Sequence, residues 1–242
     1  MAAWLEALVI QAHDQLLEEH REILWGRGAS EEQIDLYRLG YLDSELPEAE
    51  YPQDFLEWWN EQERDDVFVF PLTNTLGQVK GLQLRYVDRS RKGYTDFISI
   101  KEEPVLFGLG EAMKAIWEHE TICVVEGVFD LFPVQRHVPF CVSTLHAGLS
   151  GVLVRVLKRL VQKIWFLYDM DREGQKAVSK IYKRYGRDFE FHNILMPKVP
   201  YHGRPVKDPG ELWEVWGDAR LGVFLRKQFD STLKLDPIQM ET

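Results

Sequence analysis

The residues best suited to do chemistry are acidic side chains in two groups, each placed directly after an apolar run. The groups are Glu126-Gly-Val-Phe-Asp130, which follows Thr121 to Val125, and Asp169-Met-Asp171-Arg-Glu-Gly174, which follows Ile164 to Tyr168. Carboxylates a few ångströms apart cannot all ionise without a compensating cation. Mg²⁺ and Mn²⁺ are hard cations that take carboxylate oxygens as ligands. The two groups therefore predict a site for metal-dependent phosphoryl transfer.

Strands must position these acids, and the sequence predicts a parallel sheet. Neither apolar run alternates apolar with polar residues, which is typical of a strand covered on both faces. Strand and helix patterns alternate with short connections from residue 119 to about 215, as in an α/β fold. Ligands of such sheets lie beyond the carboxyl ends of the strands. We therefore expect Glu126, Asp169 and Asp171 to meet at one edge of the sheet.

A third motif, Lys207-Asp208-Pro209-Gly210-Glu211, lies where a loop ends and a helix begins. Asp208 capping the helix, with Pro209 at its first position, explains this motif without any function. A solvated acidic loop explains the second group equally well when it is taken alone. A calcium-binding hand is excluded because its twelfth position, which needs an acid, is Lys180. The occurrence of all three motifs in this order is what favours a catalytic site.

The first 118 residues follow a different pattern. The spacing predicts helices over residues 1 to about 24, 31 to 38 and 54 to 63, and a hairpin of strands Val67 to Leu72 and Val79 to Val87. A basic loop from Arg85 to Tyr94, a strand near Phe97 to Ile100 and a helix from Gly110 to His119 follow. Beyond the third motif we expect helices over Pro209 to Trp216 and Ala219 to Phe229, then a tail.

The net charge of −10 is distributed unevenly along the 242 residues. Through Asp66 there are eighteen acids against four arginines and no lysine, and the remainder has twenty-five basic residues against twenty-one acids. The remainder can therefore meet a nucleic-acid backbone despite the overall charge. Cys123 and Cys141 lie in apolar runs and are expected to be buried thiols, with no zinc site. The sequence carries no signal peptide and no apolar run that could span a membrane, so we expect a cytoplasmic protein.

The three motifs, in this order, resemble the TOPRIM domain shared by topoisomerases, primases and some nucleases. The upstream segments Ile23 to Tyr41 and Phe70 to Arg85 resemble the opening segment and the hairpin of a bacterial-type, DnaG-like primase catalytic core. The resemblance spans roughly residues 15 to 230. It implies an α/β fold in which a TOPRIM parallel sheet flanked by helices occupies residues 119–215. A smaller mixed α+β subdomain would precede it at 1–118, and a C-terminal helix and tail would follow at 216–242.

The resemblance also implies roles for individual residues. Glu126, Asp130, Asp169 and Asp171 would be catalytic and, with Asp208, would hold two or more Mg²⁺ or Mn²⁺ ions. Glu211 is expected to substitute for an acid that many primases carry at the position of Gly210. The side chains expected to contact template or nucleotide are Arg27, Arg85, Lys92 and Lys207. Lys80, Arg89 and Arg91 are added from local charge alone, and a solvated basic loop explains them almost as well.

The implied activity is that of a DNA primase, which synthesises short RNA primers from NTPs on single-stranded DNA. A replicative helicase or a separate zinc-binding protein would be its partners, because no zinc-binding or helicase-binding segment is recognised. Two alternatives remain: a metal-dependent TOPRIM nuclease, and a non-enzymatic replication module that recruits partners through the acidic helices. Because the chain starts at Met1 with its own acidic helix, we expect a natural stand-alone core, of the kind that phage or mobile elements encode, rather than a fragment.

Overall fold

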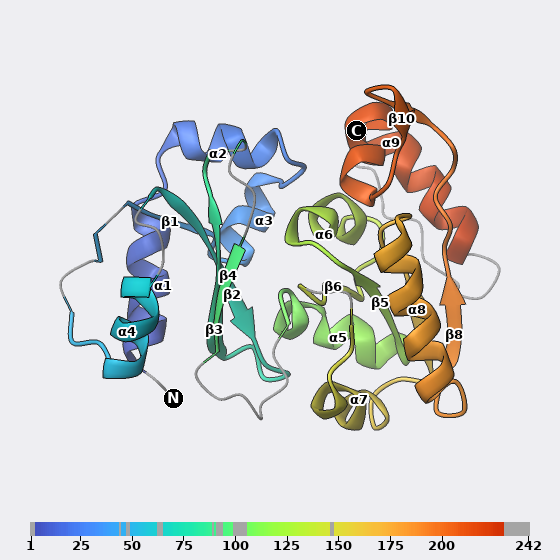
Figure 1. Ribbon diagram of the computed structural model, residues 1–242, viewed down its shortest axis with the longest axis horizontal. Coiled ribbons are helices and arrows are strands. Elements are labelled where there is room, and N and C mark those ends of the chain that lie inside the picture. Colours follow the sequence, from blue (N-terminus) through green and yellow to red (C-terminus); the bar gives the residue numbers. More distant parts are fainter. Residues whose placement is uncertain are drawn as a thin grey trace.

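The computed structural model describes residues 3–43, 45–46, 49–61, 65–88, 90, 94–98, 106–145 and 148–229. The chain forms two halves that lie side by side, an N-terminal half (α1 to β4) and a parallel-sheet half (α5 to α9) (Figure 1). Among the predicted binding residues, Arg89, Arg91 and Lys92 lie outside the described residues.

The N-terminal half packs helices against an antiparallel sheet with the strand order β1-β2-β3-β4. Its elements are α1 (Ala3–Asp14), α2 (Glu18–Trp25), α3 (Glu31–Leu36), β1 (Gly40–Leu42), α4 (Gln53–Glu61), β2 (Val67–Thr73), β3 (Val79–Tyr86) and β4 (Tyr94–Ile98). The predicted hairpin is present as β2 and β3. Its turn is closed by the Asn74 side chain, whose Oδ1 accepts the backbone N–H of Leu76 at 3.0 Å and of Gln78 at 3.1 Å.

Several features of this half differ from the sequence prediction. Strand β4 begins at Tyr94, three residues before the predicted start of this strand. The helical pattern over residues 1–24 is broken into α1 and α2, because Leu17 takes an extended backbone (φ −77°, ψ 167°) before α2 begins. Strand β1 was not predicted, since three residues give no readable alternation. A Cβ atom at Gly40 would lie 2.6 Å from the Cβ of Ala12, so glycine lets α1 pack directly on β1.

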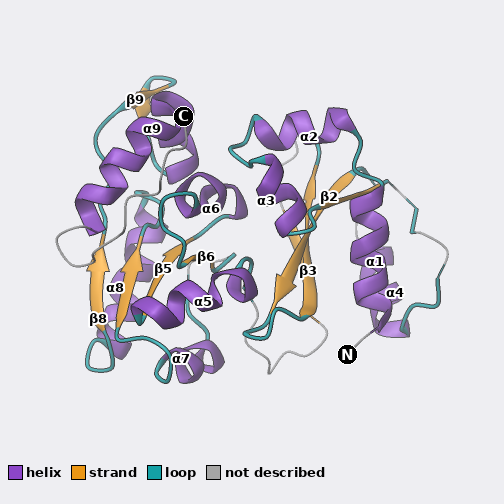
Figure 2. Cartoon of the chain, turned by 180° about the vertical axis from the view of Figure 1, so that it is seen from behind, coloured by secondary structure: helices purple, strands orange, loops and turns teal. Residues whose placement is uncertain are grey.

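The parallel-sheet half has the strand order β6-β5-β7-β8, with all neighbouring strands parallel. Its elements are α5 (Leu109–His119), β5 (Thr121–Val125), α6 (Val128–Gln135), β6 (Cys141–Ser143), α7 (Gly151–Leu157), β7 (Lys163–Phe166), α8 (Arg172–Tyr185), β8 (Glu190–Asn193), β9 (Pro200–Tyr201), β10 (Arg204–Pro205) and α9 (Pro209–Phe229). Helices α8 and α5 cover opposite faces of the sheet (Figures 1 and 2). The β9–β10 hairpin was predicted as loop, because strands of two residues carry no pattern.

Side chains of β7 alternate between the two faces and explain how both are covered. Phe166 packs on Phe191 beneath α8, with ring centroids 5.5 Å apart. Trp165, on the other face, packs against Phe229 at the end of α9 at 4.7 Å. This arrangement confirms the prediction, made from the apolar run, of a strand that is buried on both faces.

The two halves share one apolar core and specific polar contacts. Leu106 pairs with Thr73 of β2, and its neighbour Phe107 pairs with Ser143 of β6, so two consecutive residues join the two sheets. The buried Gln33 amide donates to the carbonyl of Phe132 at 3.0 Å. The two halves therefore pack against each other, and the boundary at residue 118/119, at the end of α5, stays a prediction.

Helix α9 combines the two helices that were expected near the carboxyl end. Gly217 has a non-helical backbone (φ 70°, ψ 173°) and marks the kink between them. The boundary expected at 215/216 falls just before this kink, and Leu221, Leu225 and Phe229 beyond it are buried in the core. No helix among the described residues is both long and apolar enough to cross a membrane.

Candidate active site

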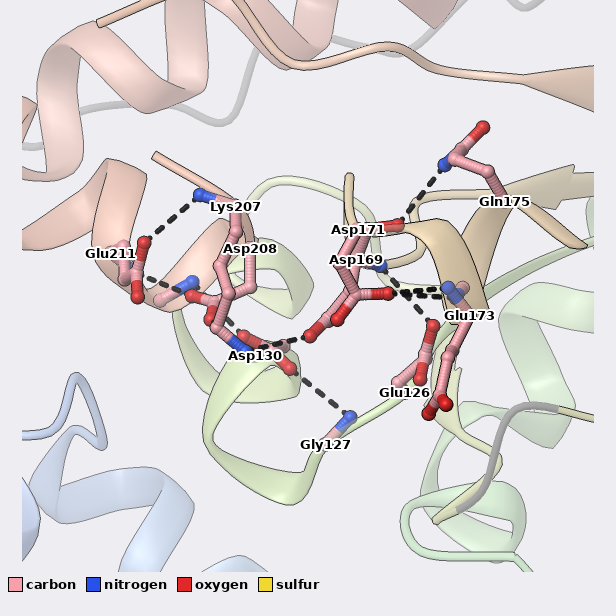
Figure 3. A network of polar contacts seen from close by, with 12 residues as sticks. Glu126, Gly127, Asp130, Asp169, Asp171, Glu173, Gln175, Lys207, Asp208 and Glu211 are labelled. Carbon is pink, nitrogen blue, oxygen red and sulfur yellow. Dashed lines mark hydrogen bonds and ion pairs between the residues drawn. The ribbon is translucent and has the colours of Figure 1, made fainter. Parts of the chain in front are cut away.

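The first two acidic motifs meet at the carboxyl ends of β5 and β7, as predicted (Figure 3). Glu126 follows β5, and its Oε1 accepts the backbone N–H of Asp169 at 3.3 Å. Beneath them the hydroxyl groups of Tyr168 and Thr144 are 3.0 Å apart, and the Ser143 hydroxyl donates to the Glu126 carbonyl at 2.9 Å. These buried contacts fix where both carboxylates emerge from the sheet.

Asp171 caps the amino end of α8. Its Oδ1 accepts the backbone N–H groups of Glu173 and Gly174, both at 2.9 Å, and its side chain lies at the exposed side of the site. Gly174 has a steric role, since a Cβ atom there would lie 2.5 Å from Oε1 of Glu126. The glycine of the Asp-x-Asp-x-x-Gly motif therefore allows the first carboxylate to lie against the helix.

Asp130 connects the first motif to the third. It lies on α6 with only 9% of its surface exposed. Its Oδ2 accepts the backbone N–H of Gly127 at 3.1 Å, and its Oδ1 accepts that of Gly210, also at 3.1 Å. Burial, reinforced by the charges of Asp208 and Asp169, raises the pKa of Asp130 well above its usual range. The side chain therefore joins the start of α6 to the start of α9, 80 residues further along the chain.

The third motif brings Asp208 and Glu211 to the site in different ways. Asp208 accepts the backbone N–H of Glu211 at 2.7 Å and so caps α9. Glu211 is bound by Arg204, whose Nη1 lies 2.7 Å from Oε2, and by the backbone N–H of Lys207 at 2.9 Å. Burial by itself raises the pKa of Glu211, but the hydrogen bonds from Arg204 and from the backbone of Lys207 outweigh it, so the pKa of Glu211 is lowered. Its charge is therefore already compensated by Arg204.

The ammonium group of Lys207 lies among the carboxylates. Its Nζ is 2.9 Å from Oδ2 of Asp169 and 3.5 Å from Oδ2 of Asp208. Burial works against its charge, but the hydrogen bond to Asp169 and the neighbouring acids raise the pKa of Lys207. Lys207 was predicted to contact template or nucleotide; in this structure its contacts are with the second and third acidic motifs (Figure 3).

The carboxylate cluster, defined as Glu126, Asp130, Asp169, Asp171 and Asp208, carries more negative charge than Lys207 balances. Burial and the nearby Asp169 raise the pKa of Glu126 to about 7. Burial, with the charges of Glu211 and Asp169, raises the pKa of Asp208 to about 6. An all-oxygen donor set with surplus negative charge fits a hard divalent cation. Within the described part of the chain, no three acidic, histidine or cysteine side chains converge closely enough to hold one ion together.

Two arginines of the N-terminal half approach the cluster through Phe129. The guanidinium carbon of Arg27 lies 3.1 Å from the centre of the Phe129 ring, and that of Arg85 lies 5.7 Å from it. Phe129 directly precedes Asp130, so both predicted binding residues contact a side chain of the first motif. Lys80 precedes Arg85 by five residues on β3, about 17 Å along an extended strand, and the structure does not bring it to the site.

Sequence reasoning missed several residues that shape the site. Phe129 carries the two arginines, and its signal was its position inside the first motif. The Gln175 amide donates to the Asp169 carbonyl at 3.1 Å, and this residue follows the second motif directly. Arg204 gave no signal, because only the fold brings it to Glu211.

Comparison with known proteins identifies relatives of the whole arrangement. Residues 123–212 match a family model described as Toprim-like. A DNA primase of Neisseria meningitidis is 33% identical over 219 residues, covering 80% of this chain and 35% of the relative. One from Deinococcus radiodurans is 27% identical over 182 residues, covering 64% of this chain and 31% of the relative. The chain is a homologue of bacterial DNA primases.

The fold of this primase homologue is also that of solved primase cores. A structure of the Aquifex aeolicus primase with its zinc-binding and RNA polymerase domains matches with a TM-score of 0.70 and 23% identity, over 92% of this chain and 59% of that one. A DnaG primase catalytic domain bound to single-stranded DNA matches with a TM-score of 0.70 and 19% identity, over 93% and 80%. The predicted TOPRIM-type α/β fold is thereby confirmed. The chain aligns with only about a third of the length of its curated relatives.

Proposed function

We propose that this chain is the catalytic core of a DNA primase, which synthesises short RNA primers from NTPs on a single-stranded DNA template. The observation that carries the proposal is the cluster at the ends of β5 and β7, where Glu126 and Asp169 meet in a chain whose relatives are DNA primases. A nucleotidyl transfer needs compensation of developing negative charge, and carboxylate oxygens such as those of this cluster are the ligands that the compensating cations prefer.

The acids of the cluster have distinct roles in this proposal. Glu126, Asp169, Asp171 and Asp208 would hold Mg²⁺ or Mn²⁺, which when bound lowers the pKa of an attacking hydroxyl and stabilises a leaving pyrophosphate. Asp130 has both oxygens bound by backbone N–H groups and would keep the first and third motifs in register. Lys207 would neutralise part of the charge on Asp169 and Asp208. Glu211 would orient Arg204.

The arginines on Phe129 are the proposed contacts for nucleotide or template phosphates. Arg27 and Arg85 hold positive charge against Phe129, the residue before Asp130, and would offset the repulsion between the acids and an anionic triphosphate. The likeness to a catalytic domain bound to single-stranded DNA supports such a template. A replicative helicase or a separate zinc-binding protein is the proposed partner.

Primer synthesis on mixed-sequence single-stranded DNA with four NTPs and Mg²⁺ or Mn²⁺ tests the proposal. Asp169→Asn should reduce synthesis by at least about 100-fold, because it removes a charge from the cluster. Asp188→Asn is the matched control. Asp188 follows the end of α8 that is remote from the cluster, and its Oδ1 lies 2.9 Å from Nζ of Lys158. Unchanged synthesis in Asp169→Asn would contradict the proposed site. Cleavage of labelled DNA that needs Asp169, without any synthesis, would replace the proposal with a nuclease.

A further inference from the structure

The outer face of α8 and the turn that follows it carry a line of basic side chains. From Arg172 to Arg187 the sequence has six basic residues and one acid, Glu173. We call these six the basic stripe: Arg172, Lys176, Lys180, Lys183, Arg184 and Arg187. All six are exposed, and none forms an ion pair with an acid among the described residues. The neighbouring acid Asp188 pairs instead with Lys158 at 2.9 Å.

This arrangement works against the stability of the helix itself. Arg172, Lys176, Lys180 and Arg184 follow one another at intervals of four residues, so each places its charge next to a like charge. Like-charged pairs at this spacing destabilise a helix; Arg172 in the first turn also opposes the helix dipole, whereas Lys183 and Arg184 in the last turn favour it. A solvated helix face usually mixes both signs of charge. A single-sign line of this length therefore indicates a polyanionic ligand.

A groove with aromatic walls runs beside the stripe. It has a volume of about 330 Å³ and lies between α8 and the edge strand β8, lined by Tyr182, Lys183, Phe191, His192 and Asn193 among others. Tyr182 is 59% exposed, and its ring contacts Phe191 edge-on at 6.0 Å. Proteins that bind single-stranded nucleic acids combine exposed aromatic rings with positive charge, because the bases stack on the rings and the basic side chains contact the phosphates.

We propose that the basic stripe and the groove beside it bind the backbone and a base of single-stranded nucleic acid. Helix α8 begins one residue after Asp171, so the stripe leads directly away from the carboxylate cluster. Its length of about 21 Å is enough to follow several successive phosphates of one strand. Figures 1 and 2 place α8 on the opposite face of the sheet from α5 and beside the edge strand β8, away from the N-terminal half that carries Arg27 and Arg85.

This surface is additional to the contacts of the proposed function and rests on that function only in expecting that the strand is a template. Binding can be measured without polymerisation. Loss of primer synthesis with intact binding to α8 would therefore overturn the proposed function and leave this inference standing. If the chain makes primers but its binding to nucleic acid does not depend on the stripe, this inference is overturned and the proposed function stands.

Fluorescence anisotropy with a labelled oligothymidylate, over a series of NaCl concentrations, tests the stripe. In Lys176→Gln/Lys180→Gln/Lys183→Gln, the slope of log affinity against log salt should fall by about 2, because each lost contact with a single strand contributes about 0.7. The control Lys114→Gln/Arg226→Gln/Lys227→Gln removes the same charge from exposed positions on α5 and α9 and should keep the slope. Equal losses in both variants would reduce the effect to net charge and overturn the proposal.

Three further arms separate the groove from general attraction of anions. Tyr182→Ala should weaken oligothymidylate binding roughly tenfold while Tyr182→Phe keeps it; Trp117→Ala, at a 72% exposed aromatic on α5, should have no effect. An RNA–DNA duplex is tested as a competitor. If the stripe substitutions weaken duplex binding as much as they weaken oligothymidylate binding, the single-strand assignment is overturned. Equal competition by polyglutamate would identify an acidic protein surface as the ligand instead. Circular dichroism confirms that each variant is folded.

Discussion

The carboxylate cluster and the basic stripe are adjacent in the chain but are built in opposite ways. In the cluster, hydrogen bonds hold the side chains. Asp130 accepts hydrogen bonds from two backbone N–H groups, and Asp169 accepts one from the ammonium group of Lys207. On α8, the basic side chains extend into solvent without acidic partners among the described residues. The difference teaches that the cluster depends on geometry, which one methyl group can disturb, whereas the stripe depends on long-range charge that salt screens.

The largest effect is expected from that single methyl group. Gly174→Ala should reduce primer synthesis by about 100-fold, because its Cβ would collide with the backbone carbonyl oxygen of Asp169 and would lie 2.5 Å from Oε1 of Glu126, displacing both acids. The control is Gly151→Ala, where an added Cβ meets nothing within 4 Å. Synthesis and far-ultraviolet circular dichroism are compared for both proteins. Full activity in Gly174→Ala would break the claim that the cluster depends on geometry.

A smaller effect is expected at the contact between the halves. Arg27→Met should raise the KM for NTPs or the Kd for template about tenfold with little change in kcat, because it removes a cation 3.1 Å from the Phe129 ring and leaves the acids in place. Arg27→Lys should recover part of the affinity. Steady-state kinetics separate the two parameters. A fall in kcat at constant KM would assign Arg27 to the transition state instead.

The surplus charge of the cluster predicts how Mg²⁺ stabilisation varies with pH. The folded protein raises the pKa of Glu126 from 4.5 to about 7, so between these values the folded state holds a proton that the unfolded state releases. Without metal, stability should therefore fall as the pH rises through this window. Because Mg²⁺ binds the ionised acids, it should raise the Tm by several degrees at about pH 8 and by less at about pH 5.5. Scanning calorimetry measures both, and equal shifts would refute the assignment.

The smallest effect concerns the stability of α8. Lys176→Gln/Lys180→Gln removes like charges four residues apart and should raise the free energy of unfolding by a few tenths of a kcal/mol, roughly 0.2–0.5 per pair. Urea unfolding at low and high salt measures the change, which should shrink as salt screens the repulsion. A loss of stability at low salt would show that these lysines have stabilising partners and would remove the contrast with the cluster.

The local elements of the fold could be read from the sequence, and the elements that depend on partners could not. The buried strands β5 and β7 and the hairpin of β2 and β3 follow from apolar runs and turn residues close in sequence. Strand β1 exists because β2 lies beside it, and the break after α1 because the chain turns to pack α2. Such choices are made by tertiary contacts, which outweigh local preference.

The sequence by itself determined that acids would stand at the ends of buried parallel strands, because an apolar run followed by Asp or Glu specifies both the strand and its polar end. Only the tertiary structure decided what each charged side chain does there. Asp130 accepts a hydrogen bond from the N–H of Gly210, Lys207 donates one to Asp169, and Arg204 donates one to Glu211. The physical reason is that a hydrogen bond of about 3 Å is fixed by where distant segments pack, and spacing along the chain does not contain that distance.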